Sequence, residues 1–533
     1  MAETLTPQQK QAVQDRGGRL LVSAAAGSGK TKVLVDRLMR YLQDPIHPAN
    51  IDEFLLITYT KAAASELRGK IAAKLTEKIA EDPQNKHLQR QMQRLYLTKI
   101  STVHAFCGDI LREYAYQLNI PGDFRVADEN ECAALRLSVV ESVLADAYET
   151  AGEHPDFCAF VDSQGVGRSD AQVPELILKV YDSAKCHLDP QKWLDECLQK
   201  MDVGNVQDAA DTPFGKYLME RLHSWLDLQM EAMAQAASLA EQAGDMEKVA
   251  VLMANTVHQL TALRKCTQWD QIVAKGDVDF GRLVFPKNIA DAGLADSIKA
   301  VRANCKKGLE KQLRPFADPS QRVLQDLGSC LQAAKGLVAL VQAFEKAFAQ
   351  AKRTRRILDF SDLEHKMLDL LWGKSRSGIT AVADEIGTRF REIMVDEYQD
   401  SNEVQDAIYH ALSCKKQDLF MVGDVKQSIY QFRLADPGIF LKKYATFVPA
   451  EEAMPGEDRK VVLSRNFRSG GAVLAAANDV FRTCMCPEVG GLYYGDEEAL
   501  YEGVAHIPLD SPEIELFCVD VQQDTYEDRK SVV

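Results

Sequence analysis

Two stretches decide the fold: AAAGSGKT at residues 24–31 and VDEYQD at residues 395–400. The first follows an apolar run at residues 20–22 and precedes a helical pattern, which is the strand-to-helix context of a phosphate-binding loop. Backbone amides of such a loop, together with the N-terminus of the helix, bind phosphate oxygens. We expect Lys30 to contact the β- and γ-phosphates of a nucleoside triphosphate and the Thr31 hydroxyl to bind Mg²⁺. The residues assigned to the loop are Ala24, Ala25, Ala26, Gly27, Ser28, Gly29, Lys30 and Thr31, with Ala24 at the usual place of the first glycine.

The second stretch places two acidic residues at the end of a predicted strand. Residues 393–395 form a short apolar run, and Asp396 and Glu397 follow it directly. Asp396 is positioned to hold Mg²⁺, and Glu397 to orient or deprotonate an attacking water molecule. The two motifs, in this order and on strand ends, predict an enzyme that hydrolyses a magnesium nucleoside triphosphate.

Length and composition are those of a globular protein with several structural units. The chain has 533 residues, of which 46% are hydrophobic and 26% charged, and this length suggests about three to four units. The apolar runs are shorter than the ~20 residues that a membrane span needs. Because the N-terminal stretch MAETLTPQQKQ has no signal-peptide pattern, we expect a cytoplasmic location and no membrane association.

The net charge limits the kind of nucleic-acid contact to expect, and the cysteine pattern limits the metal sites to expect. The formal net charge of −15 argues against a generally basic nucleic-acid coat. It leaves room for a local basic channel lined with aromatic side chains. The 12 cysteines include no CxxC pair, so we interpret them as free thiols and expect no metal beyond the Mg²⁺ of the nucleotide.

The periodicity of apolar residues divides the chain into three regions. Residues 1–118 alternate strand-like runs with helices, the pattern of a parallel α/β core. Residues 119–385 are rich in Ala, Gln, Leu, Glu and Lys at helical spacing. From residue 386 the α/β pattern returns. The simplest interpretation is an α/β domain with a parallel sheet flanked by helices, interrupted by a large all-helical insertion.

Further polar and aromatic residues follow the predicted strands. Tyr59, Thr60 and Lys61 end one strand, and Thr102, His104 and Phe106 end another. Hydroxyl and ammonium groups suit phosphate oxygens, and exposed aromatic rings suit nucleic-acid bases. After the acidic pair, Asp424 and Gln427 follow a strand, with Tyr430, Phe432 and Arg433 just beyond, and a later strand leads to Phe467 and Arg468.

Each of these residues also has a purely structural interpretation. Tyr59 and Phe106, taken singly, are more often core aromatics than stacking platforms. His104 alone is more often a hydrogen-bonded structural histidine, and Arg468 alone a surface charge. Their common place at successive strand ends favours a ligand-binding crevice, since α/β sheets bind ligands there.

The series LTPQQ (5–9), AAAGSGKT (24–31), ITYTKAAASELR (57–68), STVHAFC (101–107), MVDEYQD (394–400), VGDVKQSIYQFR (422–433) and LSRNFRS (463–469) resembles the UvrD/RecB group of superfamily 1 DNA helicases. EDPQNKHLQRQ (81–91), ISTVHAFCGDILREY (100–114) and FRVADENE (124–131) are similar to the AddA (RexA) type of helicase–nuclease within that group.

The resemblance implies a role for each matching position. Gln9 would bind the adenine edge, Phe467 would lie against the adenine, and Arg468 would contact the γ-phosphate. Gln427 would link the γ-phosphate to a DNA-facing loop. The strand path would be lined by Tyr59, Thr60, Lys61, Thr102, His104, Phe106, Tyr430, Phe432 and Arg433. ATP and Mg²⁺ would be the cofactors, and movement would run 3′ to 5′ along single-stranded DNA.

It also implies a domain division. Residues 1–118 and 386–460 would form a RecA-like motor domain (1A), and residues 119–385 an inserted helical domain (1B) that contacts duplex DNA. Lys299, Arg302 and Lys306, or residues 352–356, are candidate contacts, although a solvated helix face is an equal alternative. Residues 461–533 would begin a second RecA-like lobe (2A), most of which is absent, as is the nuclease domain of the family.

The expected function is an ATP-dependent helicase motor of an AddAB-type complex in double-strand-break repair, with an AddB/RexB-type partner. The alternatives are a stand-alone UvrD-type repair helicase and a module that binds ATP and DNA without turnover. A small-molecule NTPase or kinase is a further class, which the cluster of Tyr430, Phe432 and Arg433 disfavours.

Overall fold

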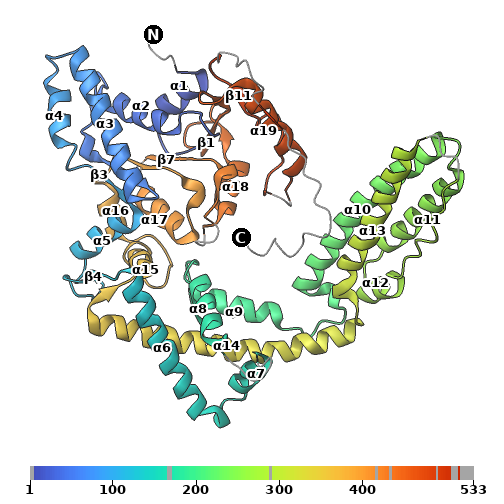
Figure 1. Cartoon of the computed structure of the whole chain (residues 1–533). Coiled ribbons are helices and arrows are strands. Elements are labelled where there is room, and N and C mark those ends of the chain that lie inside the picture. The colour runs from blue at the N-terminus through green and yellow to red at the C-terminus, as the bar shows by residue number, and fades with distance from the viewer. Residues whose placement is uncertain are drawn as a thin grey trace. The chain divides into compact units, whose positions relative to one another are not determined.

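The computed structural model describes residues 5–164, 171–286, 291–414, 418–430, 435–487, 490–505 and 514–515. It contains two compact units (Figure 1). The sheet-containing unit comprises Met1–Ala134, Lys185–Leu188 and Gln350–Val533, and the helical unit comprises Leu135–Ala184 and Asp189–Ala349.

The first unit is built on a seven-stranded sheet whose pairings are all parallel. The strand order is β3-β2-β6-β7-β1-β9-β8. The strands are β1 (Arg19–Ala24), β2 (Phe54–Thr58), β3 (Lys99–Thr102), β6 (Glu392–Val395), β7 (Asp418–Gly423), β8 (Val448–Pro449) and β9 (Arg459–Leu463). The predicted α/β class with a parallel sheet flanked by helices is confirmed.

Both faces of the sheet are covered, which explains the continuous apolar runs of its strands. On β1, Leu20 and Val22 pack into one core and Leu21 into the other, because successive side chains point to opposite faces. One core adds residues of α1 (Pro7–Gln14), α2 (Lys30–Leu42), α3 (Lys61–Glu81) and α4 (Lys86–Arg94). The other adds residues of α5 (Val103–Glu113), α15 (Phe360–Trp372), α16 (Ala381–Gly387), α17 (Glu403–Ser413) and α18 (Pro437–Thr446).

The boundary between the units differs from the predicted insertion of residues 119–385. Helices α15 and α16 bury Leu363, Met367, Leu371 and Ile386 in the core of the sheet. Helical periodicity reveals that these residues are buried, but not against which core. A short parallel pair, β4 (Arg125–Val126) with β5 (Ile357–Leu358), also lies in the sheet-containing unit, where we predict helix.

The segment after β9 forms a small substructure of its own. β10 (Arg465–Asn466) pairs in parallel with β11 (Tyr501–Glu502), and α19 (Gly471–Cys484) lies between them in the chain. Residues 461–463 belong to β9, so the seven-stranded sheet extends beyond residue 460, where we predict the second lobe to begin.

The helical unit has an apolar core of its own. Its helices are α7 (Pro155–Gln164), α8 (Val173–Ala184), α9 (Pro190–Met201), α10 (Pro213–Gln242), α11 (Glu247–Arg264), α12 (Trp269–Lys275) and α13 (Ala292–Leu313), with most of α6 (Glu129–Glu149) and α14 (Ser320–Arg355). Trp269 packs against Phe316 with ring centroids 4.4 Å apart, and its indole N–H donates to the Asp318 carbonyl at 2.9 Å.

One described helix, α14, has the length and apolar composition of a membrane span. Only 33% of its most apolar window is buried. A helix that packs against the core of a globular unit can also have this composition.

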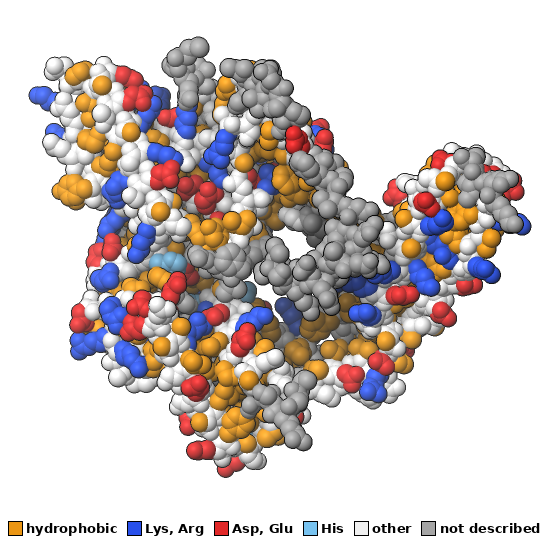
Figure 2. Space-filling view, in the orientation of Figure 1, with side chains coloured by type: hydrophobic (Ala, Val, Ile, Leu, Met, Phe, Trp, Pro, Cys, Tyr) orange, Lys and Arg blue, Asp and Glu red, His pale blue; other side chains and the backbone are white. Residues whose placement is uncertain are grey.

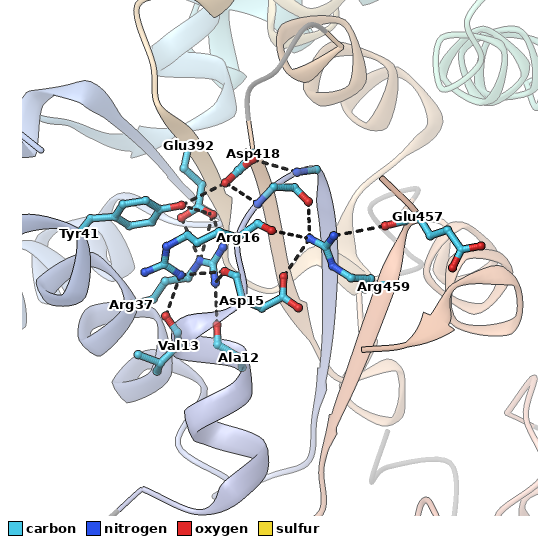
Figure 3. A network of polar contacts seen from close by, with 12 residues as sticks. Ala12, Val13, Asp15, Arg16, Arg37, Tyr41, Glu392, Asp418, Glu457 and Arg459 are labelled. Carbon is cyan, nitrogen blue, oxygen red and sulfur yellow. Dashed lines mark hydrogen bonds and ion pairs between the residues drawn. The ribbon is translucent and has the colours of Figure 1, made fainter. Parts of the chain in front are cut away.

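A buried network of charged groups joins the amino ends of the strands to α1 and α2 (Figure 3). The Arg37 Nε lies 3.0 Å from both carboxylate oxygens of Glu392, and these two side chains are 2% and 0% exposed. Arg37 also donates to the Ala12 carbonyl at 2.8 Å, and the Tyr41 hydroxyl donates to Asp418 at 3.1 Å. These contacts fix the C-terminal end of α1 to the sheet.

Candidate nucleotide and DNA site

The predicted phosphate-binding loop connects β1 to α2. Its backbone turns at Gly27 (φ 69°) and Gly29 (φ 85°), and Gly29 is the N-cap of α2. A side chain is strained at such positive φ values. The loop therefore directs amide groups and the N-terminal end of α2 toward one point, which suits an anion.

Ala24 does not occupy a turn. It is the last residue of β1, fully buried and paired with Leu463 of β9. The chain is extended there, so a Cβ is accommodated and a glycine is not required.

Two segments remote in sequence hold this loop by hydrogen bonds to its carbonyl groups. The Gln9 amide, on α1, donates to the Ser28 carbonyl at 2.9 Å. The Asn466 amide donates to the Ala26 carbonyl at 2.7 Å, and the Phe467 backbone N–H donates to the Gly27 carbonyl at 2.9 Å. A Cβ on Gly27 would lie 2.7 Å from the Asn466 side chain. The loop geometry thus depends on tight packing as well as on backbone freedom.

Lys30 meets the predicted catalytic residues of two other strands. Its ammonium lies 3.0 Å from a Glu397 carboxylate oxygen and 3.3 Å from the Gln427 side-chain oxygen. Glu397 follows β6, and Gln427 ends a short 3₁₀ turn, Val425–Gln427, after β7. Parallel strands bring their carboxyl ends to one edge of the sheet, so residues almost 400 positions apart converge.

Glu397 is held in an uncommon backbone conformation. Its φ is +53°, in the left-handed region that non-glycine residues rarely adopt. The Gln399 amide donates to the Glu397 carboxylate at 2.9 Å, and the Gln399 side-chain oxygen accepts from the Asp424 N–H at 2.9 Å. Strain of this kind is a common feature of functional sites.

Two carboxyl groups beside Glu397 have raised pKa values. Burial and the neighbouring Glu397 charge raise the pKa of Asp396 to about 6. The same two causes raise the pKa of Asp400 to about 6. One Asp400 oxygen is buried with no hydrogen-bond partner. We did not predict a role for Asp400, although its place four residues after Asp396 in VDEYQD was a usable signal.

A cavity of about 350 Å³ extends from this acidic group toward the predicted DNA residues. Its walls include Thr31, Asp396, Glu397, Asp400 and Gln427 at one end and Tyr59, Thr60, Glu66, Lys70 and Tyr430 elsewhere. The rings of Tyr59 and Tyr430 stack with centroids 4.5 Å apart and an interplanar angle of 30°. Nucleotide-site and DNA-site candidates therefore share one cavity.

Two of the remaining predicted DNA residues near this edge, Thr60 and Thr102, cap helices. The hydroxyls of Thr60 and Thr102 accept from the N–H groups of Ala63 and Ala105 and cap α3 and α5. Lys61 is exposed at the start of α3. A capping hydroxyl still has a free lone pair, so these roles are compatible with a ligand contact.

His104 and Phe106 take different positions. The His104 ring is 30% exposed and lies 3.1 Å from a carboxylate oxygen of the buried Glu364. Phe106 is 2% exposed and packs in the core against Phe390. The prediction that Phe106 lines the strand path is wrong, because its ring has no surface available for a base.

Arg468 lies on the loop that follows Phe467 and is exposed. Its backbone N–H donates to the Asn466 side chain at 2.7 Å, which ties this loop to the phosphate-binding loop. Phe432 and Arg433 lie outside the described residues.

The basic residues considered for duplex contact also differ in availability. Lys352 is buried in ion pairs with Asp359 at 2.7 Å and Asp362 at 2.6 Å, so it is a structural residue. Arg302 donates to the Phe280 carbonyl at 3.0 Å. Across the face of the sheet-containing unit seen in Figure 2, basic and acidic side chains are interspersed.

Comparisons with known proteins identify the family of the chain. A family model described as the UvrD/REP helicase N-terminal domain matches residues 5–448. An ATP-dependent helicase/nuclease subunit from Pelotomaculum thermopropionicum is 36% identical over 95% of this chain and 40% of its own length. Proteins of the same name from Heliobacterium modesticaldum and Bacillus licheniformis are 35% and 34% identical over 99% and 97% of this chain, and 41% and 42% of their own lengths. The chain therefore belongs to the UvrD/REP helicase family.

Proposed function

We propose that this chain is the ATP-binding part of a DNA helicase motor that hydrolyses Mg·ATP and moves 3′ to 5′ along single-stranded DNA. The observation that carries the proposal is the convergence of Glu397 and Gln427 on the Lys30 ammonium, at 3.0 and 3.3 Å. A phosphate-loop lysine, a carboxylate that can activate water and an amide beside the DNA-facing loop are the parts a DNA-coupled ATPase requires.

The residues present fit a magnesium nucleotide. Asp396 and the Thr31 hydroxyl would hold Mg²⁺, which would neutralise charge on the phosphates when bound. Lys30 would bind the β- and γ-phosphate oxygens. Glu397 would accept a proton as the water oxygen bonds to the γ-phosphorus, and the bond from that phosphorus to the bridging oxygen breaks to leave ADP. Gln9 would contact the base, with Phe467 beside it and Arg468 near the γ-phosphate.

The wider assignment rests on the relatives. The chain spans about 40% of the length of the curated relatives that it matches. We infer that the whole protein unwinds DNA within a helicase–nuclease complex with a second protein chain, and takes part in repair of double-strand breaks in the cytoplasm. An inserted helical domain with the bounds of the helical unit, Leu135–Ala184 and Asp189–Ala349, and a second lobe that begins after β9 belong to this proposal.

ATP hydrolysis with and without single-stranded DNA tests the proposal. We expect DNA to stimulate phosphate release, and Lys30→Ala to lower it by about 10²–10³-fold, the range for losing one preorganised group that stabilises the transition state. Arg40→Ala removes an exposed cation from the same helix and should leave turnover unchanged.

Full turnover by Lys30→Ala would disprove the site assignment. DNA-independent turnover by the unmodified chain would favour a small-molecule NTPase instead. Binding of ATP and DNA without turnover would indicate that the hydrolytic step needs the rest of the longer protein.

A further inference from the structure

Lys426, next to Gln427, lies in a buried group of charged side chains that does not contact the phosphate-binding loop. Its ammonium is 3.1 Å from an Asp424 oxygen and 2.7 Å from a Glu498 oxygen. The Lys426 and Glu498 side chains are only 7% and 8% exposed. The Tyr444 hydroxyl, on α18, donates to the other Glu498 oxygen at 2.6 Å.

One end of this group leads to the nucleotide site. Asp424 accepts from Lys426 and, at 2.7 Å, from the Gln427 amide. The Gln427 side-chain oxygen in turn accepts from Lys30 at 3.3 Å. The position of Gln427 thus depends on Asp424, whose charge is balanced by Lys426.

Glu498, on the other side of Lys426, is connected to the phosphate-binding loop by a second set of contacts. Glu498 lies in the segment of residues 490–505, which contains β11, the partner strand of β10. The Gly503 N–H donates to the Asn466 carbonyl at 2.7 Å, and Gly503 packs against the Phe467 ring. Asn466 and Phe467 are the residues that hold the loop carbonyls of Ala26 and Gly27.

The phosphate-binding loop is thus connected to residues 490–505 by two sets of contacts. One runs through β10, and the other through Gln427, Asp424 and Lys426. We propose that Lys426 and Glu498 are positioning residues that couple Gln427 to this segment, so that nucleotide binding changes both together. The inference rests on the proposed function. It deepens that function by naming residues 490–505 as the segment whose conformation responds to nucleotide binding, and the Lys426–Glu498 ion pair as the contact on which the response depends.

A buried ion pair is a poor source of stability, because desolvation offsets most of the attraction. Its role here is geometric: the ammonium lies 3.1 Å from Asp424 and 2.7 Å from Glu498, so both contacts are kept only while the two segments stay close together. An apolar pair would hold them with less specificity.

Hydrogen exchange of residues 490–505 tests the coupling without requiring turnover. Exchange is measured in the full chain with and without magnesium and a non-hydrolysable ATP analogue, and analogue affinity is measured in parallel. We expect the analogue to change exchange in this segment at least fivefold in the unmodified chain. Lys426→Met and Glu498→Gln should bind the analogue within twofold of normal affinity and lose that change, and Lys426→Arg should retain it.

Lys443→Met is the matched control. Lys443 lies on α18, the helix that also carries Tyr444, and forms a partly buried ion pair with Asp406 of α17 at 3.1 Å. A similar loss of thermal stability in Lys443→Met, with the change in residues 490–505 retained, separates coupling from stability.

Persistence of the full exchange change in Lys426→Met overturns the proposal. An unmodified chain that binds the analogue without any change in residues 490–505 also overturns it, while the proposed function stands. A chain that binds no nucleotide overturns the proposed function and the coupling with it.

Discussion

The two edges of the seven-stranded sheet carry the same kinds of side chain and differ in how these are satisfied. At the amino edge, Arg37 and Glu392 form an ion pair that is nearly excluded from solvent. At the carboxyl edge, Lys30 and Glu397 form a pair whose side chains are 13% and 37% exposed. One pair is enclosed by protein, and the other lies at a cavity.

Both edges hold buried polar atoms without a hydrogen-bond partner. At the amino edge, two such atoms, Asp15 Oδ1 and Arg459 Nε, belong to side chains joined in an ion pair at 2.9 Å. At the amino edge, Asp418 accepts from the N–H groups of Gly17 and Gly18 at 3.0 and 2.9 Å, and from Tyr41 (Figure 3). At the carboxyl edge, an Asp400 oxygen is buried without a partner, and the pKa values of Asp396 and Asp400 are both raised by burial and by Glu397. A charged cluster whose charges are paired and enclosed fits a structural role, whereas one that lies beside a cavity suits a ligand.

The largest expected effect comes from breaking the amino-edge pair. Glu392→Ala leaves the Arg37 guanidinium buried without its partner, so we expect a loss of about 3–5 kcal/mol in the free energy of unfolding. Urea denaturation measures it. Glu81→Ala, which removes an exposed ion pair with Lys78, should cost less than about 1 kcal/mol.

The combined change Arg37→Met with Glu392→Leu should cost less than Glu392→Ala alone, because no unpaired charge remains. If the combined variant loses as much stability as Arg37→Met and Glu392→Leu added together, the charges themselves hold α1 in place.

The next effect concerns the backbone of the phosphate-binding loop. Gly27→Ala imposes a side chain at φ 69° and a Cβ within 2.7 Å of Asn466. Backbone strain of this kind costs about 1–3 kcal/mol, so we expect nucleotide affinity to fall by about ten- to a hundredfold in a fluorescent-nucleotide titration. Gly69→Ala, on α3 with open space around it, should instead stabilise the helix by about 1 kcal/mol.

A smaller effect is expected at Gln427, which separates nucleotide binding from DNA response. Gln427→Ala removes the contacts with Lys30 and Asp424, each a hydrogen bond to a charged group of about 1.5–3 kcal/mol. We expect ATP affinity to stay within threefold and stimulation by single-stranded DNA to fall about tenfold in a phosphate-release assay. Unchanged stimulation would assign the DNA response to other residues.

The smallest effect is a pH dependence confined to the carboxyl edge. Mg²⁺ binds the ionised carboxylate, and the pKa of Asp396 is raised to about 6. Protonation therefore weakens Mg²⁺ binding as pH falls, by about twofold at pH 6 and about tenfold at pH 5 relative to pH 8. Mg²⁺ titrations of ATP hydrolysis across this range measure the shift.

Asp400→Asn distinguishes the two acidic groups. If protonation of Asp396 causes the loss of Mg²⁺ binding at low pH, the Asp400→Asn variant still binds Mg²⁺ more weakly as pH falls. If the dependence disappears, Asp400 is the titrating group, since its pKa is also raised to about 6.

The features predicted correctly from sequence are those that depend on residues close together in the chain. The loop at residues 24–31 and the acidic pair at Asp396 and Glu397 were placed at strand ends by short apolar runs beside them. Prediction from sequence failed for Phe106, because an aromatic residue near a strand end has the same local pattern whether it faces solvent or core. It also did not identify Asn466, whose role in holding Ala26 depends on a partner 440 positions away.

Residue type and spacing alone specify the parallel α/β core, the loop at residues 24–31 and the acidic pair at a strand end, because each of these depends on residues within a few positions of one another. Tertiary structure decided which helices belong to the core, as α15 and α16 show. It also decided which charged residues are enclosed and which line a cavity. The pairs Arg37–Glu392 and Lys426–Glu498 join segments 355 and 72 positions apart. No local pattern specifies such pairs, because the energy that fixes them comes from burial and packing that exist only once the sheet has assembled.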